Sequence, residues 1–195
     1  MTYALPPGPA PPPRRQVLVG TALAGAGTLM LIGGMLAVWV LQRERALDQP
    51  DGTWVPSGVT MPEVPTNVML IGLLALVLFA QWAVYAARRG DRVHTGLAFG
   101  LVGLLGLAVI NAQAYVWNQI DLPIAEEGGY AGMFYAVTGT MTALLIAGVV
   151  FTAVTAFRYL GGRTTDREIV AAHALYWYVL TVAFCAVWFV VYVTK

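Results

Sequence analysis

The sequence has very little charge for its length. Charged side chains make up 11% of the 195 residues, whereas a soluble domain carries about 25%. So few charged groups cannot give a globule of this size a hydrated surface, which excludes a soluble globular enzyme. Disorder is excluded as well, because disordered chains are poor in apolar residues and 58% of this chain is hydrophobic. The net charge of +1 gives no electrostatic basis for binding nucleic acid.

Residue types that carry chemistry are also scarce. The single cysteine, Cys185, can form neither an internal disulfide nor a metal cluster. The two histidines, His94 and His173, fall at the edges of apolar runs, where they suit an interfacial position better than a haem iron, whose axial ligands are held against its ring. We therefore expect no catalytic, cofactor-binding or metal-binding residue in this chain, and leave open whether it belongs to an enzyme complex.

What the sequence does contain is long apolar runs. About 20 apolar residues cross the hydrocarbon of a bilayer, and five runs are long enough and hold no Asp, Glu, Lys or Arg. Strands of membrane barrels are about 10 residues long and alternate strictly, whereas these runs are longer and do not alternate. The sequence thus predicts an all-α, polytopic membrane protein with a five-transmembrane-helix bundle. Its predicted helices span residues 17–41, 66–87, 96–119, 132–157 and 170–193.

The part before the first run differs in composition. Residues 1–16 are rich in proline, which predicts an extended cytoplasmic tail, followed by a single transmembrane domain over residues 17–195. The alternative is a signal peptide. However, its apolar core would be about 7–15 residues long, whereas this run has no break over residues 17–41. The length favours a retained helix.

The positive charges predict an orientation. The segment before the first run and the second and fourth connections hold Arg14, Arg15, Arg88, Arg89, Arg92, Arg158, Arg163 and Arg167, and the other side holds Arg43, Arg45 and Lys195. Since positive charge stays in the cytoplasm, we expect the N-terminus inside and the C-terminus outside. The expected location is the bacterial cytoplasmic (inner) membrane.

Polar residues within the runs are amides and hydroxyls. Because charged groups inside a membrane usually serve transport, the absence of Asp, Glu, Lys and Arg from all five runs argues against a self-contained pump. Asn111, Tyr115 and Asn118 share one face of the third predicted helix. They could line a small polar site, or they could hydrogen-bond a neighbouring helix, as polar residues in membranes commonly do. We favour the second interpretation.

Small residues recur at helical spacing in two of the runs. Such stripes let membrane helices approach closely, so we predict helix packing or subunit contact at Gly20, Ala24, Gly27, Gly34, Gly96, Gly100, Gly103 and Gly106. The alternative is that glycine is simply frequent in membrane helices.

Aromatic and proline residues mark the borders of the runs. Most tryptophans fall near predicted helix ends, which is typical of interfacial anchoring: Trp54, Trp82, Trp117, Trp177 and Trp188. The first connection, residues 42–65, contains four prolines and Trp54. We expect it to be a rigid external excursion that lies on the membrane or on a partner.

Five segments in register resemble a known family. They are Trp-Val-Pro at 54–56 with Pro-Thr-Asn at 65–67, Gln-Trp-Ala-Val-Tyr-Ala-Ala-Arg-Arg-Gly-Asp at 81–91, Gln-Ala-Tyr-Val-Trp at 113–117, Gly-Tyr-Ala-Gly-Met-Phe-Tyr-Ala-Val-Thr-Gly at 129–139 and Tyr-Trp-Tyr at 176–178. Their order and spacing resemble subunit III of the haem-copper oxidases, cytochrome c oxidase among them, in its five-helix bacterial form. The resemblance implies an accessory, non-catalytic subunit of a respiratory oxidase that braces the catalytic subunit and binds lipid. Haem and copper are then expected in partner subunits, the catalytic subunit I and subunit II, which implies a hetero-oligomer.

The chain departs from that family at its ionisable intramembrane positions. Acids of the family correspond here to Val116, Thr28 and Thr181, and histidines correspond to Met141, Leu144 and Tyr178. The resemblance therefore implies a scaffold rather than a part in proton uptake. The alternatives are an accessory subunit of a nitric oxide reductase, an independent small transporter or membrane enzyme that uses the Asn111, Tyr115 and Asn118 face, and a transiently bound assembly factor.

Overall fold

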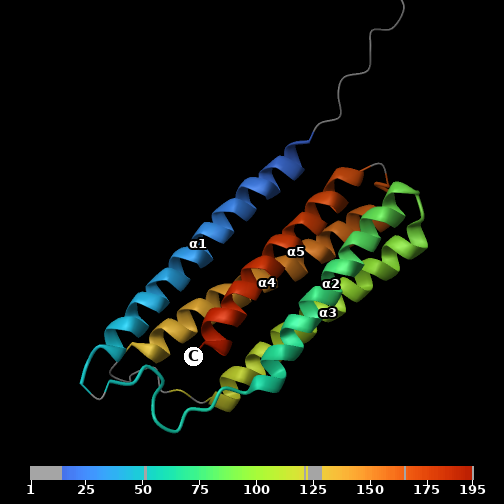
Figure 1. Ribbon diagram of the computed structural model, residues 1–195. Coiled ribbons are helices and arrows are strands. Elements are labelled where there is room, and N and C mark those ends of the chain that lie inside the picture. The colour runs from blue at the N-terminus through green and yellow to red at the C-terminus, as the bar shows by residue number, and fades with distance from the viewer. Residues whose placement is uncertain (1–14, 51, 121, 123–128, 165, 195) are drawn as a thin grey trace, which may run out of the picture.

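The computed structural model describes residues 15–50, 52–120, 122, 129–164 and 166–194, and in them the chain is helical with no strand. Its helices are α1 (Gln16–Leu47), α2 (Glu63–Arg88), α3 (Arg92–Ile120), α4 (Tyr130–Leu160) and α5 (Arg167–Val187), which continues as the π-helix η1 (Trp188–Val193) (Figure 1). Five of these segments are long and apolar enough to cross a membrane. The predicted all-α, five-helix architecture is confirmed.

Some predictions fall outside the described residues. They include residues 1–14 of the predicted tail and two of the positive charges behind the predicted orientation, Arg14 and Lys195.

Every helix extends beyond its apolar run. Helix α1 continues through Arg43, Glu44 and Arg45 to Leu47. Helix α2 begins at Glu63, with Pro65 in its first turn, where proline is tolerated because that amide has no intrahelical partner. The first connection is therefore shorter than the predicted 42–65. The length of an apolar run reflects the thickness of the membrane hydrocarbon. A helix ends instead where its backbone N–H and C=O groups are satisfied by partners outside the helix.

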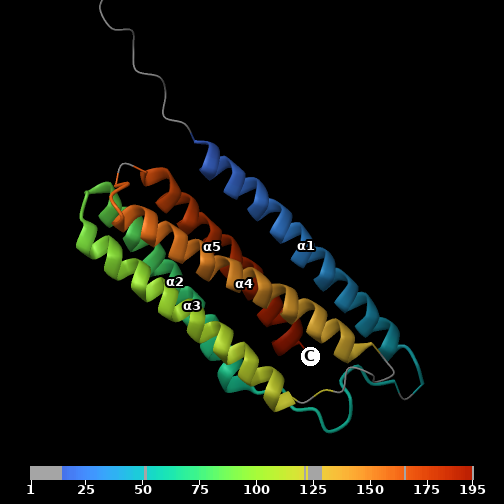
Figure 2. The same cartoon turned by 180° about the vertical axis from the view of Figure 1, so that it is seen from behind.

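Helix α5 lies at the centre of the bundle. Helices α1, α2 and α4 all pack on it, and α3 packs on α2 and α4. Figure 2 shows the same arrangement from behind, with α1 along one edge. Helices α1 and α5 run parallel, because the Leu18 amide donates to Glu168 Oε1 (3.0 Å) at one end and Arg43 Nη2 donates to the Thr194 carbonyl (3.3 Å) at the other. The end with the α2–α3 and α4–α5 turns is called the turn end below, and the opposite end is the loop end.

The first connection folds back onto the bundle at the loop end. Trp54 is only 5% exposed and lies between Trp39 and Tyr130, with ring centroids 5.2 Å and 5.3 Å away. The Trp39 and Trp54 rings meet edge to face, an arrangement that favours aromatic pairs. The interpretation of Trp54 as an interfacial anchor is wrong, because its ring is buried between Trp39 of α1 and Tyr130 of α4. Trp177, at 0% exposure, is not an interfacial anchor either.

Candidate functional site

The small-residue stripe of α1 faces away from the rest of the chain. Gly20, Ala24, Gly27 and Gly34 are all exposed, and a Cβ added at any of the three glycines meets nothing within 4 Å. Helix α1 instead packs through another face, on which Gly25, Ile32, Leu36 and Trp39 are buried. The stripe makes no close contact within the described residues, so its role as a contact with another subunit stays a prediction.

The stripe of α3 divides into two pairs. A Cβ at Gly96 would lie 3.3 Å from Leu160 Cδ2, and one at Gly106 would lie 2.9 Å from Val149 Cγ2, so both glycines sit at close approaches to α4. Gly100 and Gly103 meet nothing within 4 Å. They line an open apolar groove of about 450 Å³ together with Leu104, Val149 and Phe157.

The predicted polar face of α3 is turned outward. Asn111, Tyr115 and Asn118 are all exposed, with Tyr115 at 52%. Within the part of the chain that the structure describes, no side-chain hydrogen bond joins them to another helix. A hydrogen-bond partner for this face would have to come from outside those residues.

His173 lies in the interior of the bundle. It is 0% exposed, and its Nε2 atom is 2.8 Å from Thr152 Oγ1 and 3.1 Å from the indole nitrogen of Trp177. The rings of Phe99 and Phe151 flank it at 5.2 Å and 5.7 Å. The prediction of an interfacial histidine is wrong for His173, because α5 begins at Arg167 and carries it inward beyond the first turn.

A polar cluster that the sequence analysis missed lies at the α2–α3 turn. Gly90 has a φ of +74°, a left-handed conformation that suits the glycine ending a helix. Asp91 immediately precedes α3: its Oδ1 accepts the His94 amide (3.1 Å) and its Oδ2 lies 2.6 Å from His94 Nδ1. The His94 backbone amide, followed by the His94 ring, lowers the pKa of the Asp91 carboxyl. Asp91 therefore stays ionised and committed to its own helix.

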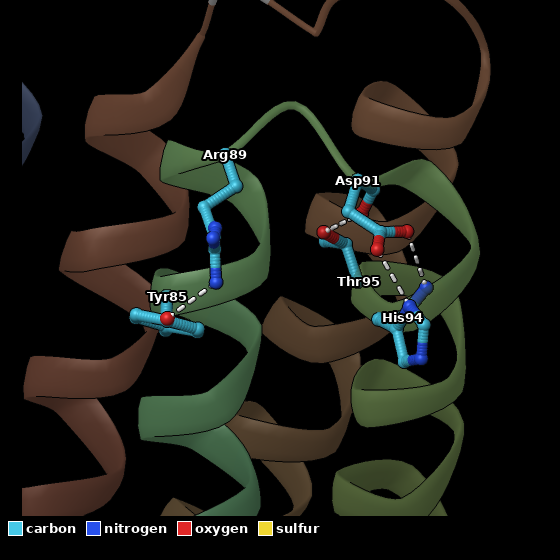
Figure 3. Close-up of polar contacts among 5 residues, drawn as sticks. All are labelled: Tyr85, Arg89, Asp91, His94 and Thr95. Atoms are coloured by element: carbon cyan, nitrogen blue, oxygen red, sulfur yellow. Dashed lines mark hydrogen bonds and ion pairs between the residues drawn. The ribbon is translucent and has the colours of Figure 1, made fainter.

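Arg89 lies at the same turn, on the α2 side, next to Asp91 and His94 (Figure 3). Its Nη1 donates to the Tyr85 hydroxyl one helical turn back, and its guanidinium carbon lies 5.2 Å from the Tyr85 ring centroid. No carboxylate within the described ranges pairs with Arg89. Figure 3 shows Arg89 and His94 pointing in the same direction from the two helices, toward the body of the bundle.

These side chains border a cleft of about 410 Å³, lined by Trp82, Tyr85, Ala86, Arg89, Asp91 and His94. A guanidinium without a carboxylate partner, next to a phenol and an imidazole, can hold an anion. The signal in the sequence was local: Tyr85 and Arg89 are four residues apart and Asp91 and His94 are three apart, spacings that bring side chains together at a helix end. Across the described residues, no three His, Cys, Asp or Glu side chains gather as a metal site would require.

The chain is similar to known proteins over most of its length. Residues 46–195 match the family described as cytochrome c oxidase subunit III. Cytochrome c oxidase subunit 3 of Corynebacterium diphtheriae is 28% identical over 183 residues, which cover 91% of this chain and 87% of that protein. The probable cytochrome c oxidase subunit 3 of Mycobacterium bovis is 25% identical over 189 residues, with the same shares covered. The subunit 3 of Rattus norvegicus is 31% identical over 130 residues, 65% of this chain and 49% of that protein.

Proposed function

The chain belongs to the cytochrome c oxidase subunit III family, and from this premise we propose that it is the accessory, non-catalytic subunit of a respiratory haem-copper oxidase. The observation that carries the proposal is the family match over residues 46–195, which contains all of α2, α3, α4 and α5. The two bacterial relatives extend the similarity to 91% of the chain.

The partners follow from that role. The chain is a multi-pass membrane protein and one component of a multi-subunit oxidase. We propose that its direct partners are the catalytic subunit I, which holds haem and copper, and subunit II. The supporting features are two outward faces, the small-residue stripe of α1 and the Asn111, Tyr115 and Asn118 face of α3, which are left uncovered within the described residues.

We further propose that the turn end faces the cytoplasm of a bacterium, which places the N-terminus inside. Arg15 precedes α1 there, and the two turns with the helix ends that flank them carry Arg88, Arg89, Arg92, Arg158, Arg163 and Arg167. Positive charge is retained on the cytoplasmic side. Arg158 is paired with Asp166 across the α4–α5 turn at 2.9 Å, so the uncompensated charge is greater at the α2–α3 turn.

The proposed role is to brace the complex rather than to conduct protons. Three positions where the family has ionisable groups hold the neutral residues Val116, Met141 and Thr181, all buried within the bundle. Tyr178, which replaces a histidine, donates its hydroxyl to Gln81 Oε1 and ties α5 to α2. A neutral side chain cannot hold or release a proton at these points, whereas a helix-to-helix hydrogen bond stabilises the scaffold.

Purification from native membranes tests the proposal. With an affinity tag on this chain and extraction in a mild detergent, we expect a haem-bearing polypeptide to co-purify at a fixed stoichiometry, with an absorption spectrum that changes on reduction. Oxygen consumption by the complex would support an oxidase, whereas consumption of nitric oxide would identify the alternative reductase. Recovery of the chain without any haem-bearing partner contradicts both.

The α1 stripe gives a second prediction. We expect Gly27→Leu to leave the chain folded but to lower recovery of the haem-bearing partner about tenfold, because overpacking an interface costs about 1–3 kcal/mol and about 1.4 kcal/mol is a factor of ten. Gly33→Leu is the matched control, since Gly33 is also exposed, also has nothing within 4 Å and lies off the stripe. Equal recovery with both variants would show that the stripe is not a subunit contact.

A further inference from the structure

We propose that the cleft at the α2–α3 turn receives a carboxylate side chain, Asp or Glu, from a neighbouring protein subunit, with Arg89 as its principal ligand. The inference rests on the proposed function, because it requires that the chain is assembled with other polypeptides. It goes further by naming a surface that makes one of the contacts and the chemistry of the partner that this surface fits.

Arg89 is held in a fixed position without being neutralised. A guanidinium carries five N–H donors, and in Arg89 one nitrogen, Nη1, donates to the uncharged Tyr85 hydroxyl. The Tyr85 ring lies 5.2 Å from the guanidinium carbon, which further fixes the orientation of the group. The planar guanidinium presents its other donors as a rigid fork, and such a fork matches the two oxygens of a carboxylate.

The described carboxylates at the turn end are committed to other groups. Asp91 accepts the His94 amide at 3.1 Å and pairs with the His94 ring at 2.6 Å. Asp166 pairs with Arg158 at 2.9 Å, and Glu168 accepts a backbone amide of α1 at 3.0 Å. Each of these acids therefore compensates a group other than the guanidinium in the cleft.

The rest of the sequence holds no further acid for this end of the bundle. Residues 1–14, which precede α1 at the turn end, contain no Asp or Glu. The remaining acids fall, in sequence, at the helix ends and in the connections of the loop end: Glu44, Asp48, Asp51, Glu63, Asp121, Glu126 and Glu127. A carboxylate partner for Arg89 therefore has to come from another molecule.

The side chains around Arg89 are of the types that dominate protein interfaces. The cleft of about 410 Å³ is lined by Trp82 and Tyr85 in addition to the guanidinium. Tyr85 is 56% exposed, and Trp82 is half-buried with its ring 5.8 Å from the His94 ring. Trp, Tyr and Arg are enriched among the residues that carry most of the binding energy between proteins. The aromatic rings can pack on the methylene groups of an acidic side chain, whereas a small free anion would use only the guanidinium.

Two further arginines extend the positive charge around the cleft. Arg88 and Arg92 are exposed on either side of the turn, but of the three arginines only Arg89 lines the cleft. Charge at the rim of an interface steers a partner of opposite charge, whereas a desolvated, hydrogen-bonded charge pair fixes it in place. The three positions should therefore differ in how closely they approach the acid of the partner.

Carbodiimide cross-linking in native membranes tests the proposal. The reagent activates a carboxylate, and a lysine amine in contact with it displaces the reagent and forms an amide bond, whereas an arginine guanidinium does not react. The chain contains a single lysine, Lys195, so a lysine introduced at the turn meets little background from this chain. Three variants of the full chain with a lysine-free affinity tag are compared: Arg89→Lys, Arg88→Lys and Arg92→Lys.

We expect Arg89→Lys to form a cross-link to one Asp or Glu of another polypeptide, identified by mass spectrometry of the linked peptides. Arg88→Lys and Arg92→Lys keep the same charge and place the same amine in the same turn, but should give little of that product. Arg89→Glu should then weaken retention of the linked subunit about tenfold, since like charges at a contact cost binding energy. Replacing the linked acid with arginine should restore retention.

Several results would overturn the inference. A cross-link from Arg89→Lys to Asp91 alone would show that the chain supplies the carboxylate itself, and no cross-link to another polypeptide would show that the cleft receives none. Equal products from all three lysine variants would indicate a diffuse positive surface, and unchanged retention with Arg89→Glu would exclude Arg89 as the principal ligand. The haem-bearing partner is scored separately in the wild type. Its absence would contradict the oxidase role, whereas its presence without a cross-link at position 89 would contradict only the proposed contact.

Discussion

Replacing Trp177 with alanine is expected to lower the free energy of unfolding of this chain by about 3–5 kcal/mol, the range for removing a large aromatic side chain from a packed interior. Trp177 is 0% exposed and projects from the central helix α5. Its ring packs directly against glycines of two neighbouring helices. A Cβ added at Gly106 of α3 would lie 3.2 Å from the ring, and one added at Gly148 of α4 would lie 2.9 Å from it. No smaller side chain can keep these contacts.

The substitution also removes a buried hydrogen bond. The Trp177 indole N–H donates to Thr152 Oγ1 at 3.0 Å, and the same hydroxyl lies 2.8 Å from His173 Nε2. Alanine leaves both groups without this donor in a place where water is excluded, which adds to the packing loss.

Unfolding in mixed detergent micelles, followed by far-UV circular dichroism, measures the effect. Phe189→Ala is the matched control, because Phe189 lies further along the same chain segment and is 55% exposed; its effect is expected to stay within about 0.5 kcal/mol. If Trp177→Ala were no more destabilising than Phe189→Ala, the close-packed centre described here would be wrong.

Trp177 also shows what the sequence could not predict. In a soluble protein, the apolar face of a helix identifies its buried side. In a membrane both faces are apolar, because lipid tails are as apolar as leucine. Met30 and Met69 look alike in the sequence, yet Met30 is 79% exposed and Met69 only 1% exposed. Tryptophans near the ends of apolar runs could therefore be taken for interfacial anchors even where the bundle buries them.

The helices themselves were predictable because hydrocarbon thickness sets their length. Their ends were not, since they depend on local contacts such as Gly90 and Asp91 at the α2–α3 turn or the Glu168 carboxylate that accepts the Leu18 amide. The turn cluster was missed for a related reason. In the sequence, Arg89 is one of several positive charges that predict the orientation of the chain. Tyr85, one helical turn earlier, is the sign that the Arg89 guanidinium is ordered.

Regular glycine spacing was an incomplete guide to packing. It selected Gly20, Gly27 and Gly34, which meet nothing within 4 Å, together with Gly96 and Gly106, which do lie at close approaches. It passed over Gly25 and Gly148, where an added Cβ would lie 2.9 Å from Val179 and Trp177. Whether a small residue marks a contact depends on the facing side chain, which a spacing rule does not contain.

Gly148→Ala is accordingly expected to destabilise the chain by about 1–3 kcal/mol, the usual effect of overpacking a close-packed site. The new methyl group would lie 2.9 Å from the Trp177 ring and 3.0 Å from Tyr176 Cε1. Neither ring can easily move, because each is held by a hydrogen bond. The Trp177 indole N–H donates to Thr152 Oγ1 at 3.0 Å, and the Tyr176 hydroxyl donates to the Leu144 carbonyl at 2.8 Å. Helices α4 and α5 would have to separate, and the loss should exceed the gain of about 1 kcal/mol that alanine brings to a helix interior.

Gly139→Ala separates these two effects in the same helix. A Cβ at Gly139 meets nothing within 4 Å, so this variant should show only the helix-propensity gain and be as stable as the wild type or more so. The same micelle unfolding experiment compares the two substitutions. Equal stabilities of the two variants would mean that α4 and α5 can move apart without loss of stability. Gly148 would then have no packing role, like any other glycine of a membrane helix. A clear deficit for Gly148→Ala alone would establish that the contact between Gly148 and Trp177 fixes the distance between these helices.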